Sequence, residues 1–191
     1  MYEVRMHGRG GQGAVLAATI LASALIEEGM CAVAVPSFGF ERRGAPVAAF
    51  VRADSKEIRQ MTNIYRPHCI LCLDPTVGHT VNIFEGVRSG GTLVQTTHKA
   101  LADLPLPPAI STVGLCDAVT IALAIFRRPI TNTIMLGALA KTTGLVSLAA
   151  LQAALRASEF RDAGLAQNLA ALQRGFDETV VQHLDKAGRA A

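Results

Sequence analysis

The feature that most constrains this chain is a glycine-rich run, Gly8-Arg9-Gly10-Gly11-Gln12-Gly13, near the amino terminus. It stands between an extended stretch from Tyr2 to Met6 and a run of helix formers from Ala14 to Glu28. A G-x-G-x-x-G turn from a strand into a helix lets the backbone approach an anion closely, and the first N–H groups of the helix point at that anion. The run therefore predicts a site for a phosphate or a carboxylate. The alternative is a tight turn that only packs the strand against the helix.

The rest of the chain alternates between short apolar runs and helical patterns. Strands are expected at residues 31–35, 47–51, 69–73, 92–95 and 109–113, with a short strand-and-helix passage at 54–63 and a helix at 80–88. Apolar residues at three-and-four spacing predict further helices at 118–126, 132–142, 147–157 and 168–183. These patterns indicate an α/β fold, with a Rossmann-like, mostly parallel sheet flanked by helices and a helical carboxyl-terminal third. We expect one domain over residues 1–185 and a loose tail at 186–191.

A second charged loop runs from Pro36 to Pro46 and contains Glu41-Arg42-Arg43-Gly44. The first strand, the first helix and the second strand are expected to form a βαβ unit, so the carboxyl ends of these neighbouring strands share one edge of the sheet. Arg42 and Arg43 are therefore expected beside Arg9, with Glu41 orienting one of them. Three guanidinium groups near a helix amino terminus favour anion binding. A solvated loop with a surface ion pair is the alternative.

Two nucleotide-binding classes fit the glycine run less well. A dinucleotide site needs an acidic residue about 20 positions on, at the end of the second strand, where this chain has Val35-Pro36-Ser37. A P-loop needs Lys followed by Ser or Thr, where this chain has Ala14-Val15. A free NAD(P)-dependent oxidoreductase is therefore kept only as an alternative function.

The cysteines and histidines do not form a metal site or a catalytic set. Cys69 and Cys72 have the spacing of metal ligands, but they lie in a predicted strand, where positions i and i+3 face opposite sides. Buried thiols are expected instead. His7 adjoins the glycine run and is expected to be a strand-end residue bonded to backbone rather than a general base. We predict no catalytic residue and no metal ligand in this chain.

Composition limits the setting of the protein. Half of the residues are apolar and only 17% are charged, which favours a subunit within an assembly. The net charge is only +3, and the basic residues do not gather into a long stripe, so nucleic-acid binding is not expected. No apolar run reaches the roughly 18 residues of a membrane span, and no leader pattern precedes the first strand. We expect a cytoplasmic protein that binds no membrane.

Two motifs, Gly8 to Val15 and Pro36 to Val47, are separated by most of the predicted first helix and by the second strand. Their sequences and their spacing resemble those of the gamma subunit of 2-oxoacid:ferredoxin (acceptor) oxidoreductases, of the pyruvate/ketoisovalerate type. The later stretches 132–139 and 143–147 also resemble that family, so the resemblance covers nearly the whole chain.

The resemblance implies a division of labour within a complex. The complex would decarboxylate a 2-oxoacid on thiamine diphosphate, pass electrons through [4Fe-4S] clusters to ferredoxin or to a flavoprotein or NAD acceptor, and form an acyl-CoA. Its alpha, beta and delta subunits would hold the thiamine diphosphate, the Mg²⁺ and the clusters, whereas the gamma chain would bind none of them and be inactive alone.

The same resemblance implies a role for the two charged segments. The backbone of Gly8 to Gly13 would approach the phosphates of coenzyme A, and Arg42 and Arg43 would supply charge. The alternative is a purely structural subunit in which the same residues grip a partner chain.

Overall fold

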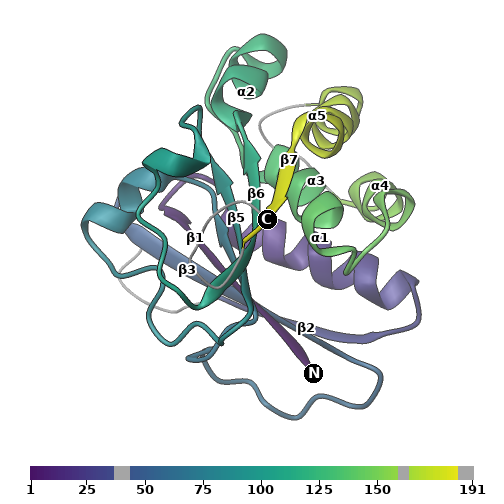
Figure 1. Cartoon of the computed structure of the whole chain (residues 1–191). Coiled ribbons are helices and arrows are strands. Elements are labelled where there is room, and N and C mark those ends of the chain that lie inside the picture. The colour runs from purple at the N-terminus through teal and green to yellow at the C-terminus, as the bar shows by residue number, and fades with distance from the viewer. Residues whose placement is uncertain (37–43, 159–163, 185–191) are drawn as a thin grey trace.

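A computed structural model describes residues 1–36, 44–158 and 164–184. A seven-stranded sheet forms the centre of this structure (Figure 1). The strand order is β2-β3-β1-β4-β5-β6-β7. Neighbours β1, β4, β5 and β6 pair in parallel, while β3 runs antiparallel to both β1 and β2, and β7 antiparallel to β6. Five strands thus share one direction, which confirms the predicted mostly parallel sheet. The strands are β1 (Tyr2–Arg9), β2 (Cys31–Pro36), β3 (Pro46–Asp54), β4 (Cys69–Cys72), β5 (Gly91–Thr96), β6 (Ile110–Cys116) and β7 (Val180–His183).

The first two strands are not neighbours, and this part of the prediction was wrong. β3 lies between them, with Gly8 opposite Val47 on one side and Pro36 opposite Ala49 on the other. A short connection favours an antiparallel return, because a parallel neighbour needs a crossover of a dozen or more residues. The carboxyl ends of β1 and β2 nevertheless lie at the same edge of the sheet. The glycine run, Pro36 and Gly44 therefore all lie at that edge.

Five helices of the described residues lie on one face of the sheet (Figure 1). Their buried side chains join those of Val4, Met6 and Leu71 in one large apolar core. None of these helices is both long enough and apolar enough to cross a lipid bilayer. The helical carboxyl-terminal third is confirmed in its position. The helices are α1 (Ala14–Glu27), α2 (Ala118–Phe126), α3 (Asn132–Thr143), α4 (Leu148–Arg156) and α5 (Leu165–Glu178).

Two glycines bring α3 and α5 into backbone contact. A Cβ at Gly137 would overlap the carbonyl oxygen of Leu172, and one at Gly175 would overlap that of Ile134. Only glycine allows two helices to approach so closely. This contact fixes α5 against the centre of the helical layer.

Irregular segments and two short 3-10 turns, η1 (Pro75–His79) and η2 (Leu101–Asp103), cover the other face. The strand-and-helix passage expected at 54–63 contains only the last residue of β3, and no helix forms at 80–88, so both helix predictions were wrong. Buried arginines explain the difference. Arg52 donates to main-chain oxygens of residues 60, 62 and 63, and Arg5 to those of 64, 83 and 85, so these carbonyls bond to guanidinium groups instead of forming helical bonds.

The last predicted helix ends earlier than expected. α5 stops at Glu178, and Val180–His183 forms β7, which pairs with β6. Thr179 adopts an extended backbone, and its hydroxyl donates to the carbonyl of Gly175. β-branched Val180 and Val181 then favour a strand. The single domain over residues 1–185 stays a prediction, and the predicted tail, 186–191, lies outside the described residues.

Candidate functional site

The glycine run forms a tight turn that is bonded to the far end of the 37–45 connection. The Gly10 N–H donates to the carbonyl of Ala45 (2.8 Å), and the Gly44 N–H donates to the carbonyl of Gly10 (3.1 Å). Gly11 and Gly13 have φ of 92° and 73°, which glycine adopts without strain. No side chain among the described residues caps α1, and its first turn has no acidic residue. The free N–H groups and positive dipole end of α1 can therefore accept an anion.

Arg9 and Gln12 brace this turn against the end of β4. The Gln12 side chain accepts from the Arg9 N–H (2.7 Å) and donates to Asp74 (2.8 Å). The Arg9 guanidinium pairs with Asp74 (3.4 Å) and donates to Thr76 (2.8 Å) and to the carbonyl of Gly44 (2.9 Å). Arg9 therefore lies beside Gly44, the last residue of the predicted Glu41-Arg42-Arg43-Gly44 stretch, and its donors are already used within the chain.

The electrostatics of Asp74 reflect this bracing. Burial by itself would raise the pKa of Asp74, but hydrogen bonds from Thr76 and Gln12 and the charge of Arg9 lower it below its ordinary value. Asp74 is therefore an anion at neutral pH and holds the Arg9 side chain in place.

Glu41, Arg42 and Arg43 lie outside the described residues. The chain enters and leaves their segment at Pro36 and Gly44, both at the carboxyl-end edge of the sheet. Gly44 itself contacts Gly10 and Arg9. The placement of the Glu41-Arg42-Arg43 side chains beside the glycine turn stays a prediction.

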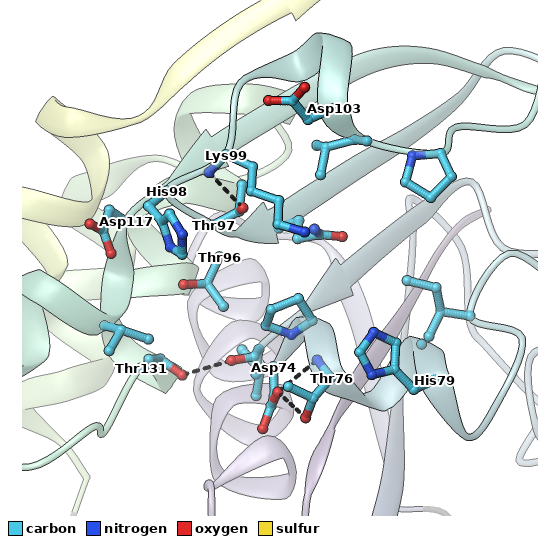
Figure 2. Close-up of a pocket in the computed structure, with 18 of the residues that line it drawn as sticks. Asp74, Thr76, His79, Thr96, Thr97, His98, Lys99, Asp103, Asp117 and Thr131 are labelled. Carbon is cyan, nitrogen blue, oxygen red and sulfur yellow. Dashed lines mark hydrogen bonds between the residues drawn. The ribbon is translucent and has the colours of Figure 1, made fainter.

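A pocket of about 840 Å³ opens next to the turn, at the carboxyl ends of β4, β5 and β6 (Figure 2). Gln12 lines it, so the pocket and the glycine turn adjoin. In an α/β sheet, ligands bind in the crevice at this end of the strands. Its apolar wall comprises Leu73, Val81, Ile83, Phe84, Leu104, Leu106 and Val119, and its polar groups include His79, Thr96, His98, Lys99, Asp117 and Thr131.

One buried polar group in this pocket has no partner. Thr96 is 1% exposed, and its hydroxyl oxygen makes no hydrogen bond within the described part of the chain. The nearby hydroxyl of Thr131 donates to the carbonyl of Leu73, and the Asp117 carboxylate caps α2 by accepting from Thr120. Buried hydroxyls are almost always hydrogen-bonded. A ligand group in the pocket would supply the missing partner of Thr96.

Lys99 and His98 also line the pocket, where the Lys99 ammonium is a cation that could meet an anionic ligand group (Figure 2). The Lys99 backbone N–H donates to the Thr97 hydroxyl (3.0 Å), which fixes the turn after β5. These residues were not predicted as a site. A partial signal was present, because polar residues lie at or just after the end of each of the buried strands β4, β5 and β6: Asp74 is two residues beyond β4, Thr96 ends β5 before Thr97 to Lys99, and Asp117 follows β6.

His7 lies outside the pocket, on the sheet face opposite the helices. It is 8% exposed and accepts a hydrogen bond from Arg5 Nε to its own Nε2 (3.0 Å), so the expected backbone bond was wrong. Burial, and then the charge of Arg5, lower the pKa of His7 to about 4. His7 is therefore a neutral acceptor that positions Arg5.

The predicted buried thiols are confirmed. Cys69 and Cys72 lie on opposite faces of β4 in separate apolar clusters, and burial raises the pKa of each to about 12. Among residues 1–36, 44–158 and 164–184, no three His, Cys, Asp or Glu side chains gather in a way that would hold a metal.

Comparisons with known proteins agree on one family. The family model named pyruvate ferredoxin/flavodoxin oxidoreductase matches residues 3–178. The chain is 63% identical over 190 residues, covering 100% of each chain, to the gamma subunit of NADH-dependent phenylglyoxylate dehydrogenase from Aromatoleum evansii. It is 47% identical to the common gamma subunit of the pyruvate/ketoisovalerate oxidoreductases of Thermococcus kodakarensis, covering 96% of this chain and 100% of that relative.

A solved structure has the same fold. The crystal structure of pyruvate oxidoreductase subunit PORC from Thermotoga maritima superimposes with a TM-score of 0.79 at 33% identity, over 94% of this chain and 97% of that one. The match spans nearly all of both chains, so the whole architecture is shared.

Proposed function

Because this chain belongs to the pyruvate ferredoxin/flavodoxin oxidoreductase family, as the gamma subunit of a multisubunit 2-oxoacid oxidoreductase, we propose that it contributes to coenzyme A binding in a complex that converts a 2-oxoacid to an acyl-CoA. The thiamine diphosphate, Mg²⁺ and [4Fe-4S] clusters of such a complex belong to its alpha, beta and delta subunits in this proposal. The chain by itself would be inactive.

The observation that supports coenzyme A binding is the junction of the glycine turn and the pocket. The uncapped start of α1 suits the pyrophosphate, because its N–H groups and dipole attract negative charge. The adjoining apolar wall, which includes Phe84, suits the adenine or the pantetheine chain, and Lys99 offers a cation for a phosphate. A ligand of this length reaches both parts, since Gln12 belongs to each.

The roles of the individual arginines differ in this proposal. Arg9 acts as a brace, because Asp74, Thr76 and Gly44 occupy its donors. Arg42 and Arg43 supply the positive charge that faces the phosphates, and Glu41 orients one of them. The backbone from Gly8 to Gly13 forms the cradle.

Kinetics of the assembled complex test the proposal. Lys99→Ala and Arg42→Ala are each expected to raise KM for coenzyme A about tenfold or more, since a charge-assisted hydrogen bond contributes roughly 1.5–3 kcal/mol. Decarboxylation of the 2-oxoacid, which does not use coenzyme A, should be unchanged. Lys141→Ala is the matched control, because the Lys141 ammonium donates to the main-chain oxygen of Asp177 in the helical layer, away from the pocket. Unchanged coenzyme A kinetics in both test variants would favour the purely structural subunit.

The relatives also bear on the 2-oxoacid. One relative is described as a gamma subunit common to pyruvate and ketoisovalerate oxidoreductases, so in this proposal other subunits select the acid, and the gamma subunit bears on it only through the relatedness of whole complexes. The identity of 63% to the phenylglyoxylate dehydrogenase subunit is higher than the 47% to the common gamma subunit, and we propose an aromatic 2-oxoacid, with NAD as acceptor. Assay of the purified complex with phenylglyoxylate, pyruvate and branched-chain 2-oxoacids, with NAD or ferredoxin, decides this. Faster turnover of pyruvate than of phenylglyoxylate would reject the aromatic assignment.

A further inference from the structure

Two buried arginines hold an irregular segment of the chain against the sheet. Arg52 is 3% exposed and donates to the carbonyl oxygens of Gln60 (3.2 Å), Thr62 (2.6 Å) and Asn63 (3.2 Å). Arg5, which is 7% exposed, adds a longer contact of 3.4 Å to the carbonyl of Ile64. The main-chain oxygens of residues 60, 62, 63 and 64 thus point inward at fixed positive charges.

The other Arg52 contact is with a buried carboxylate. Its Nε pairs with Glu3 (3.1 Å), which is itself buried and also pairs with Arg88 (3.2 Å). Burying a guanidinium costs several kcal/mol unless its donors are satisfied. Here the carboxylate and the carbonyls satisfy them, so the segment is held by bonds that would be costly to break.

Fixing the carbonyls inward turns large side chains outward. Ile58 and Ile64 anchor residues 58–64 against the sheet, with exposures of 9% and 2%. Between and beyond these anchors, Met61 is 61% exposed and Tyr65 is 72% exposed, the highest value among the large apolar side chains of the described residues. We call residues 59–66 the arginine-anchored loop.

The composition of this loop differs from that of an ordinary surface loop. Arg59 and Arg66 are exposed beside Met61 and Tyr65. Within the described part of the chain, Arg59 pairs with Glu57, and because the two side chains are 85% and 75% exposed this ion pair adds little stability. Tyr, Met and Arg are the residue types enriched where proteins bind one another. A loop already fixed in shape also loses little conformational freedom on binding, which strengthens association.

From this juxtaposition we propose that the arginine-anchored loop is a docking surface for another subunit of the same oxidoreductase complex. The facing surface of that subunit has an apolar recess that receives Tyr65 and Met61, and carboxylates that meet Arg59 and Arg66. Charge favours this partner, because residues 56–66 carry three cations and a single carboxylate. The proposal rests on the membership of the chain in a multisubunit complex and is independent of coenzyme A binding.

Assembly of the complex from separately purified subunits tests the docking surface. The double variant Met61→Ala/Tyr65→Ala should bind the remaining subunits at least about thirtyfold more weakly than the wild-type chain, the effect of losing a hot-spot residue, as measured by titration in a sedimentation or interferometry assay. Arg59→Glu should weaken binding further and make the residual affinity less dependent on salt. Because these side chains are exposed, the melting temperature of each free variant should equal that of the wild type.

A matched control separates docking from general loss of apolar surface. The double variant Ile26→Ala/Leu123→Ala removes side chains that are 55% and 47% exposed, on α1 and α2 of the helical layer. It should bind the other subunits as the wild type does. The proposal is overturned if the Met61/Tyr65 variant binds within threefold of the wild type, or if the control loses as much affinity.

Discussion

Replacing His7 with glutamine is expected to remove a large part of the acid sensitivity of this chain. The imidazole accepts a hydrogen bond from Arg5, and both side chains are buried. Protonation of His7 would place a second positive charge next to that of Arg5. It would also convert the acceptor nitrogen of the imidazole into a donor. The native state therefore requires the neutral imidazole, whereas the unfolded chain does not. A glutamine carbonyl oxygen can accept from Arg5 at any pH.

The magnitude follows from the pKa of His7, which falls from 6.5 in the unfolded chain to about 4 in the native one. At pH values above 6.5 both states are neutral and the full stability is present. As the pH falls from 6.5 through about 4, the unfolded state binds a proton that the native state does not, so stability is lost. At 1.36 kcal/mol per pKa unit, the loss is about 3 kcal/mol.

Urea unfolding at pH 7, 6, 5 and 4, monitored by circular dichroism, measures the effect. Circular dichroism suits this chain because the chain has no tryptophan. The free energy of unfolding of the wild type should fall by about 3 kcal/mol more than that of His7→Gln between pH 7 and 4. The exposed His79→Gln should keep the wild-type pH dependence. Parallel curves for the wild type and His7→Gln would refute the reasoning.

Three further outcomes are expected. Gly137→Ala should lower the free energy of unfolding by about 3 kcal/mol, because the added Cβ overlaps the Leu172 carbonyl. Gly78→Ala, where an added Cβ meets open space, should change the free energy of unfolding by less than about 0.5 kcal/mol. Equal effects of the two substitutions would contradict the packing argument. Asp117→Ala should cost about 1 kcal/mol through loss of the α2 cap, measured by urea unfolding, and no loss would show that the cap is not needed. A thiol reagent should modify only Cys31 rapidly in the native chain, since the other three cysteines are buried; rapid labelling of a second thiol would contradict their burial.

The glycine turn, most strands and the carboxyl-terminal helices could be predicted because their signals are local. A strand, a G-x-G-x-x-G run and a helix-forming stretch occupy consecutive positions, and the observed α1 begins at the predicted Ala14. The predicted α2 has the observed bounds. The opposite faces of Cys69 and Cys72 follow from strand periodicity alone.

The failures share a long-range cause. Residues 80–88 have a helical pattern, but Arg5, far earlier in the sequence, captures the carbonyls of Ile83 and Glu85. The insertion of β3 between β1 and β2 depends on pairing across the sheet rather than on any local signal. The pocket was missed because its lining comes from the ends of three strands that are separate in the sequence. Such features become visible only after the strand order is known.

The way in which Arg52 and Arg5 grip the chain has an evolutionary consequence. Every hydrogen bond they make to residues 60, 62, 63 and 64 ends on a main-chain oxygen, which is present whatever the amino acid. Substitutions at the outward-facing positions 61 and 65 therefore leave the path of the backbone intact. One scaffold can in this way change the chemistry that it displays to its surroundings without having to refold the segment that displays it.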